Sequence, residues 1–496
     1  MTRSLLTAVI SLVSFAFIAR AISRNDMGEL AVLGLVAAAT QTIAGLGVGA
    51  TAVRFVASFQ SKGDPESMRK VGYECLLING IATVIVSSIT YTLANPLARL
   101  LLGNASRGNL FQLLVLEIFA LGVNYSLSNL ALGLRRFREY SVIAITAFAV
   151  RQGAAVALLV LGFGLPGVII GWGIGDSINS ALLLGFLMKV MGPFRIGFGI
   201  PKLLKFSAPL YFGDAAGFAW TYFDTALLVP LVSLFALGAY NVAISAYAIL
   251  DSIPSSVSSA LFPYYSHFYK DGDASGTVDL ENAVKTASRY VSFLTIPLAV
   301  GLAATALPVA TLLAGTTYAD SAYPLAALSI FLAAGCLLRA LGATFIVLGK
   351  SVTSAFVTVA SIILPILLGA VIIPHLGIIG AAIAKGAALI IALVISILIL
   401  RRRMKLRFDL SAYARAWVSA ILMAVTVLAF EAVLYSKYLL PLYATVGAAV
   451  FIMSLRLFHA AKVEDLDLLS SFLGQRTNFL SRVLGRILGI EGSGLD

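Results

Sequence analysis

The chain has 496 residues, of which 60% are hydrophobic and only 12% are charged. Soluble globular proteins carry about 25% charged residues, so this composition excludes a soluble protein and indicates a membrane protein. The net charge of +12 does not predict a nucleic-acid partner, because the basic residues lie at the ends of apolar runs, where anionic lipid headgroups would meet them. Cys75 and Cys336 lie inside apolar runs and predict neither a disulfide framework nor a metal site.

Long apolar runs predict an all-α polytopic membrane protein with about 14 transmembrane helices. A helix needs about 20 apolar residues to cross the hydrocarbon core. Strands are excluded because the runs are too long and lack an alternation of period two. The predicted spans are 4–22, 29–52, 71–94, 109–133, 140–162, 167–188, 204–228, 238–263, 282–305, 323–348, 352–373, 378–400, 412–434 and 439–457.

The basic residues orient these spans. If the N-terminus is cytoplasmic, most of the 35 lysines and arginines fall in segments that the map places inside the cell. Cytoplasmic loops carry an excess of these residues. We therefore predict a multi-pass protein of the cytoplasmic membrane with both termini in the cytoplasm.

The first six spans are similar in sequence to the next six. Residues 22–103 resemble 232–315, with Gly28 paired with Gly238. Six is an even number, so the two copies predict six-helix lobes of one orientation, related by an axis along the membrane normal. The predicted parts are an N-terminal lobe (1–190), a cytoplasmic linker (191–203), a C-terminal lobe (204–403), spans 13 and 14 packed outside the bundle (404–460), and a cytoplasmic amphipathic tail (461–496).

Several ionisable residues fall inside predicted spans. Each costs roughly 2.5–3.5 kcal/mol or more in the membrane, and such groups usually line a cavity. Carboxylates can take up H⁺ or Na⁺, and arginines suit phosphate oxygens. The candidates for ion coupling or for the cavity are Glu117, Asp176, Asp214, Asp224 and Asp251. The basic candidates for binding phosphate or glycan are Arg151, Arg339 and Lys385.

The alternative for each of these residues is a mutual ion pair, for instance Arg151 with Asp176, that only joins two helices. The sequence holds no nucleophile triad, metal cluster or phosphate loop. We therefore expect no catalytic residue, no bound metal and no cofactor, with H⁺ or Na⁺ as the coupling ion if there is one.

Three stretches are similar to a known family: Ala19-Arg20 with Gly28, Arg54-Phe55-Val56-Ala57 with Lys62-Gly63-Asp64, and Leu376-Gly377-Ile378-Ile379-Gly380-Ala381-Ala382. Through them, nearly the whole chain resembles the polysaccharide flippase branch of the multidrug/oligosaccharidyl-lipid/polysaccharide exporter superfamily. The resemblance departs at the outer turn, where Asn25-Asp26 replace the usual proline. The extra two spans favour the glycan branch over drug-exporting relatives, which commonly have twelve.

The resemblance implies two lobes around a V-shaped, alternating-access cavity. It also implies a polyprenyl- or dolichyl-(pyro)phosphate-linked glycan as the substrate. Related lipid flippases bind the phosphate with arginines of spans one and two, which implies that role for Arg20, Arg24 and Arg54. From position alone, these side chains would instead extend to the lipid headgroups.

We therefore predict a flippase of lipid-linked oligosaccharide for cell-surface glycan biosynthesis, not an enzyme. The expected partners are its substrate, membrane lipids and glycan-assembly enzymes, and the protein is expected to be a monomer. A cation-coupled multidrug exporter of the same superfamily is the first alternative. A membrane glycosyltransferase or polymerase is the second, but it would need a catalytic carboxylate pair and usually a long external loop. The loops near 95–108 and 306–322 are short and carry few acids.

Overall fold

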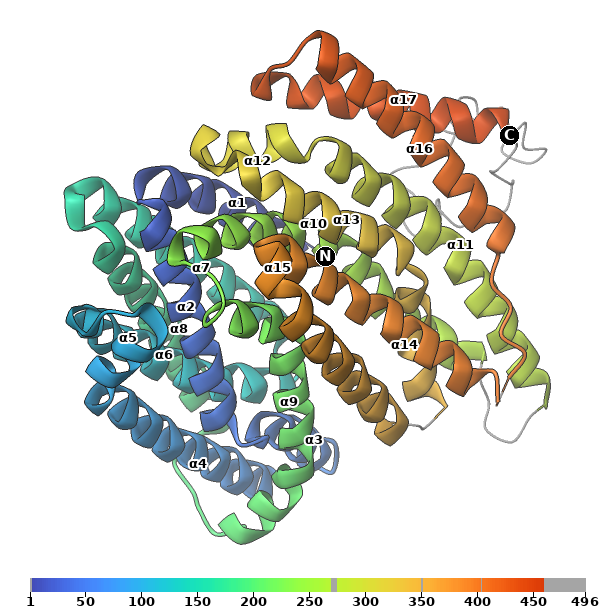
Figure 1. The fold of residues 1–496 in the computed structure, drawn as a ribbon. Helices are drawn as coiled ribbons and strands as arrows, with labels where there is room; N and C mark the ends of the chain where they lie inside the picture. Colours follow the sequence, from blue (N-terminus) through green and yellow to red (C-terminus); the bar gives the residue numbers. More distant parts are fainter. Residues whose placement is uncertain (1, 269–273, 349–350, 403, 459–496) are drawn as a thin grey trace. The chain divides into compact units, whose positions relative to one another are not determined.

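The computed structural model describes residues 2–268, 274–348, 351–402 and 404–458, and all regular structure in these residues is helical (Figure 1). The predicted amphipathic tail lies outside the described residues. Two compact units are described separately below. Unit 1 comprises 1–242, 313–315 and 362–381, and unit 2 comprises 243–312, 316–361 and 382–496. The lobe boundaries predicted from the sequence stay a prediction.

The helices follow one another through short connections. In chain order they are α1 (Thr2–Ala21), α2 (Arg24–Gly45), α3 (Val48–Ser61), α4 (Pro65–Thr92), α5 (Ala94–Leu102), α6 (Gly108–Gly133), α7 (Phe137–Leu158), α8 (Gly164–Met191), α9 (Ile200–Leu228), α10 (Leu234–Phe268), α11 (Ala274–Ala304), α12 (Ala306–Ala314), α13 (Ala322–Ala334), α14 (Leu337–Val347), α15 (Ser351–Leu400), α16 (Leu410–Val433) and α17 (Leu440–Leu457).

The predicted spans lie along these helices: spans 2 and 10 each fall on two consecutive helices, spans 11 and 12 both fall within α15, and each of the others is centred on one helix. Among the described residues, nine helical segments are long and apolar enough to cross a membrane, or ten with a pair bent by 58° at the junction of α13 and α14. Two of the nine, Phe137–Met191 and Phe356–Leu400, are long enough to hold two spans each. The predicted all-α, polytopic fold is confirmed.

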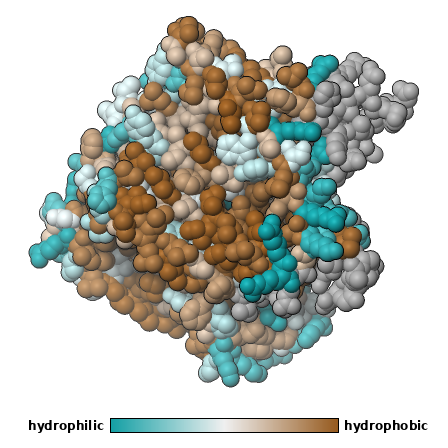
Figure 2. Space-filling model, turned by 45° about the vertical axis from the view of Figure 1, so that its right-hand side comes forward, coloured by the Kyte–Doolittle hydropathy of each residue, from teal (hydrophilic) through white to brown (hydrophobic). Residues whose placement is uncertain are grey.

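Large apolar side chains cover much of the surface, as the face in Figure 2 shows. Examples are Leu100 in unit 1 and Val433 in unit 2, which are 78% and 87% exposed. In water such a surface would be costly, because each square ångström of apolar area contributes about 25 cal/mol. It matches the hydrocarbon environment that the composition predicts.

The second predicted span is broken into α2 and α3. Leu46 and Gly47 both have left-handed backbones, with φ of 48° and 69°. Side chains from other helices stabilise the break: the Asn79 amide donates to the Ala44 carbonyl at 2.9 Å. The Thr51 and Ser207 hydroxyls lie 2.7 Å apart. The glycines at 45, 47 and 49 therefore accompany the end of α2 and the start of α3.

The turn after α3 follows the sequence pattern. Gly63 has a φ of 67°, and the Asp64 side chain accepts a hydrogen bond from the Ser67 amide at 3.0 Å at the start of α4. Hydrogen bonds from Ser67 lower the pKa of the Asp64 carboxyl. The equivalent turn of the second copy, Gly272-Asp273, lies outside the described residues.

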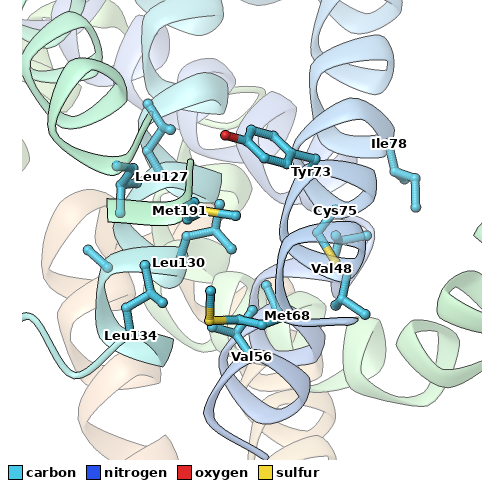
Figure 3. Packing of buried hydrophobic residues seen from close by; sticks show 14 of the residues in the cluster. Val48, Val56, Met68, Tyr73, Cys75, Ile78, Leu127, Leu130, Leu134 and Met191 are labelled. Atoms are coloured by element: carbon cyan, nitrogen blue, oxygen red, sulfur yellow. The ribbon is translucent and has the colours of Figure 1, made fainter. Parts of the chain in front are cut away.

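The core of unit 1 is built where α3, α4, α6 and α8 meet. Val48 and Val56 of α3 pack with Met68 of α4, Leu130 of α6 and Met191 of α8, all buried (Figure 3). These apolar contacts fix α3 against three other helices.

Unit 2 is organised around α11, which contacts α13, α14, α16 and α17. Spans 13 and 14, α16 and α17, pack together and against α11 (Figure 1). The Tyr413 hydroxyl of α16 donates to the Ala334 carbonyl at 3.0 Å, where α13 bends into α14. Span 13 thus supplies a hydrogen bond to the bend of span 10.

Replacing Gly47 by Ala tests the break between α2 and α3. An added Cβ would collide with the Ser207 carbonyl, and a left-handed backbone costs a residue with a Cβ about 1–2 kcal/mol. We expect a lower melting temperature of the detergent-purified protein. The control is Gly34→Ala in α2, where nothing lies within 4 Å of the added Cβ and no loss is expected. Equal melting temperatures would contradict the structure of the break.

Candidate functional site

A cluster of three charged side chains lies inside unit 1, with Glu117 and Asp176 buried and Arg151 partly buried. The Arg151 guanidinium of α7 donates from Nε to Asp176 Oδ2 of α8 and from Nη2 to Glu117 Oε1 of α6, both at 2.9 Å. The Trp172 ring centroid lies 4.5 Å from the centre of the guanidinium. The pair that the sequence suggested, Arg151 with Asp176, is present, and Glu117 makes it a triad.

Three glycines of α8 let it approach α6 and α7 closely. A Cβ at Gly175 would collide with the Arg151 backbone, and one at Gly171 with the Ala155 backbone. A Cβ at Gly173 would lie 2.8 Å from Leu116, next to Glu117. The sequence Gly-Trp-Gly-Ile-Gly-Asp at 171–176 was the signal that could have predicted this packing.

The triad carries a net negative charge in a buried place. One guanidinium faces two carboxylates, and Glu117 is only 1% exposed. The Glu117 Oε2 atom has no hydrogen-bond partner among the described residues. Burying a charge costs free energy unless it is paired and hydrogen-bonded, so this oxygen is the least satisfied atom of the cluster.

The first turn of α2 packs against the first turn of α10, both in unit 1. Arg24 Nε donates to the Phe235 carbonyl at 2.9 Å, and its guanidinium lies 3.8 Å from the centroid of the Phe235 ring. A Cβ at Gly28 would collide with the Leu234 carbonyl, and one at Gly238 with the Arg24 carbonyl. The two glycines that the duplication pairs therefore form one close contact between the two copies.

Sequence reasoning missed an ionic contact beside this turn. Arg107 Nε lies 3.1 Å from Glu29 Oε1, and Arg107 Nη2 lies 3.5 Å from Asp26 Oδ1. Glu29 is buried. An acidic residue one turn after Asp26, at the start of a span, was the available signal.

The other arginines of the first spans differ in their surroundings. Arg20 ends α1 and is exposed. Arg54 in α3 is also exposed, and its guanidinium lies 5.0 Å from the centroid of the Phe206 ring of α9. Arg54 forms no ion pair with a carboxylate among the residues that the structure describes.

Two carboxylates of α9 accept hydrogen bonds from tyrosines. The Tyr125 hydroxyl of α6 donates to Asp214 Oδ2 at 3.0 Å. The Tyr240 hydroxyl donates to Asp224, which is fully buried. Tyr125 also packs against Gly45 and Gly49, so Asp214 is linked to the α2–α3 break.

Unit 2 holds a second ion pair, between Arg339 of α14 and Asp251 of α10. The Ser258 hydroxyl fixes this part of α14 by donating to the Arg339 carbonyl at 2.8 Å. Lys385 lies half-buried in α15 of the same unit. Within the described ranges, no group of three or more histidine, cysteine or acidic residues could hold a metal ion.

A buried glutamate in the N-terminal half of α4 was also missed. Glu74 accepts hydrogen bonds from the backbone amides of Gly197, Phe198 and Gly199 at 2.6–3.0 Å. In the second copy, Glu281 of α11 accepts from the Lys405 amide at 2.6 Å. Each copy thus uses a buried glutamate to hold the chain segment that follows its sixth span.

The comparisons with known proteins decide the family. A family model described as "Polysaccharide biosynthesis protein" matches residues 17–323. The chain belongs to this family. The resemblance seen in the sequence is confirmed, while no curated protein matches the chain.

Solved structures show which fold this polysaccharide biosynthesis protein has. A structure of the lipid II flippase MurJ in an inward closed conformation is 14% identical, covers 92% of this chain and 98% of its own, and has a TM-score of 0.74. An inward-facing multidrug resistance MATE family transporter of the MOP superfamily is 15% identical over 80% of this chain and 94% of its own, with a TM-score of 0.64. At these identities the likeness concerns the fold.

Replacing Arg151 by Met tests the triad of this family member. Removing one partner of a buried pair costs about 3–5 kcal/mol, because a buried charge is left uncompensated. We expect a corresponding loss in the free energy of unfolding of the purified protein. The control is Arg136→Ala, whose exposed pair with Glu139 should contribute about 0–1 kcal/mol. A loss no larger than that of the control would contradict the triad.

Replacing Glu74 by Gln tests the segment that follows α8. The glutamine keeps one accepting oxygen but places an NH2 donor where the other oxygen was, so at least one of the amides of 197–199 loses its acceptor and we expect the segment to open more often. Trypsin should then cleave faster at the exposed Arg195. Glu139→Gln, which removes a charge far along the sequence from this segment, should leave the cleavage rate unchanged. An unchanged rate in Glu74→Gln would show that the contact does not hold the segment.

Proposed function

We propose that this protein is a flippase that moves a lipid-linked oligosaccharide across the cytoplasmic membrane by alternating access. The substrate would be a glycan on polyprenyl- or dolichyl-(pyro)phosphate, used for cell-surface glycan biosynthesis. The family supports a role in polysaccharide biosynthesis, and the fold is shared with a lipid II flippase and with multidrug transporters.

The observation that carries the proposal is Arg54. It is exposed in a helix of the membrane domain, its aromatic neighbour is Phe206, and no described carboxylate pairs with it. Arg54 follows the end of the second predicted span (29–52), and no described carboxylate neutralises its charge, so the guanidinium is available to an anionic group. Its planar fork of donors matches the oxygens of a phosphate.

The helix that carries Arg54 is held in place. Thr51, one turn earlier, lies 2.7 Å from Ser207, and Val48, Ala52 and Val56 are buried in the core of unit 1. A fixed helix positions the guanidinium with little loss of conformational entropy on binding. Arg20 and Arg24, at the opposite end of the second span, would instead add positive charge for the phosphate on the outer side.

The mechanism follows from this assignment. The glycan headgroup would enter from the cytoplasmic side with its phosphate on the arginines, while the lipid tail stays in the bilayer. Rocking of the lobes would then expose the headgroup outside. Arg339 and Lys385 would contact the glycan or phosphate from unit 2, and Asp214 and Asp251 would line the cavity, whereas Asp224 is fully buried against Tyr240. We expect a monomer with cytoplasmic termini that works beside glycan-assembly enzymes.

The multidrug exporter is the second candidate, and the observation that favours it is the set of carboxylates at Asp214, Asp224 and Asp251 on a fold shared with MATE transporters. A drug-susceptibility test in a pump-deficient host separates the two functions. The enzyme alternative is disfavoured, because Glu117 and Asp176, two carboxylates that lie together in unit 1, are buried and paired with Arg151. A catalytic pair would have to face its substrate.

The test of the proposed function is translocation of a labelled lipid-linked glycan in proteoliposomes. Hydrogen bonds to charged groups contribute about 1.5–3 kcal/mol, so Arg54→Ala should weaken substrate binding about 10- to 100-fold. Arg54→Lys should retain part of the activity, because it keeps the charge but loses the fork. The control Lys62→Ala removes a charge from the exposed turn after α3. Unchanged translocation by Arg54→Ala would refute the phosphate site.

A further inference from the structure

We propose that the Glu117–Arg151–Asp176 triad is a binding site for one proton, with Glu117 Oε2 as the atom that accepts it. The triad would be the coupling site of the proposed flippase, so this inference rests on that function. It names the ion, which the sequence leaves open between H⁺ and Na⁺, and it places the ion on one atom.

The first argument is the charge balance of the cluster. Arg151 cannot be deprotonated in a protein, so its single positive charge neutralises one of the two carboxylates. The second negative charge has no compensating cation among the described residues. One proton makes the cluster neutral, as a guanidinium with one carboxylate and one carboxylic acid.

The second argument is the hydrogen bonding. Asp176 Oδ2 and Glu117 Oε1 each accept from the guanidinium, whereas Glu117 Oε2 is buried without a partner. Arg151 of α7 and Asp176 of α8 are the charged groups of the described part that act on Glu117.

The third argument excludes a metal cation as the natural occupant. A hard cation is bound by a set of several oxygen ligands. Here two carboxylate oxygens already face the guanidinium, whose groups are donors only, and the Trp172 ring covers one side of it. Glu117 Oε2 is the one oxygen of the two carboxylates that is buried without a hydrogen-bond partner among the described residues, and a proton needs only one lone pair.

The site has a physical connection to the proposed phosphate site. Glu117 and Tyr125 lie on the same face of α6, about two turns apart. Tyr125 donates to Asp214 and packs against Gly45 and Gly49 at the break that precedes Arg54. If protonation of Glu117 changes the packing of α6, this change would therefore also alter the packing of α3, the helix that carries Arg54.

The decisive experiment measures the proton on the protein alone. Infrared difference spectra of the detergent-purified full chain, recorded between acidic and alkaline pH, should show the carbonyl band of one buried carboxylic acid. We expect Glu117→Gln to lack this band and to release one proton fewer per chain on alkalinisation. Asp251→Asn in unit 2 is the matched control and should keep both signals.

Sodium is tested in the same samples by melting the protein in NaCl and in choline chloride. We expect equal melting temperatures. A native spectrum without the band, or a band that persists in Glu117→Gln, would overturn the proposal. Stabilisation by NaCl that is lost in Glu117→Gln would overturn it in favour of Na⁺. If Glu117→Gln does not fold, Glu117→Asp replaces it, and its carboxylic-acid band should be shifted.

Failure of this site and failure of the flippase function give different results. The spectra need no substrate, so their failure leaves the Arg54 experiment valid. In proteoliposomes, an imposed pH gradient should change the rate of glycan translocation by the native protein, and Glu117→Gln should abolish that dependence. If Glu117 of the native protein is protonated but the rate of glycan translocation is the same with and without the pH gradient, coupling would be refuted.

Discussion

A backbone amide or carbonyl without a partner costs several kcal/mol in the hydrocarbon of a membrane, and this constraint explains where the helices of this protein can break. The Ala44 carbonyl at the α2–α3 break is bound by the Asn79 amide. The Ala334 carbonyl at the bend before α14 is bound by the Tyr413 hydroxyl. Each interruption therefore depends on a side chain from another span.

The same constraint applies to charge. Arg151 is tolerated inside unit 1 because two carboxylates and an aromatic ring surround it. Those contacts are possible only because glycines at 171, 173 and 175 bring α8 against α6 and α7. Backbone contact and ion pairing thus depend on each other, and the remaining negative charge is what makes the triad suited to bind a proton.

The duplication gains physical meaning from the structure. The copies agree where they shape the scaffold: Gly28 and Gly238 pack together, and Glu74 and Glu281 each hold the segment after a sixth span. They differ in their charges, with the Glu117–Arg151–Asp176 triad in unit 1 and the Arg339–Asp251 pair in unit 2. Because the two copies share a scaffold but carry different charges, one fold can contain different binding sites.

The sequence by itself determined the spans, because crossing a bilayer requires a local run of apolar residues whose length is fixed by the membrane. It also determined the family, and it identified Arg151 and Asp176 as a candidate pair. Only the tertiary structure decided that Glu117 joins them, that Leu46 and Gly47 interrupt the second span, and that Glu74 binds the segment at 197–199. These features depend on which helix faces lie together. Hydropathy hardly predicts this, because lipid-facing and helix-facing positions are both apolar.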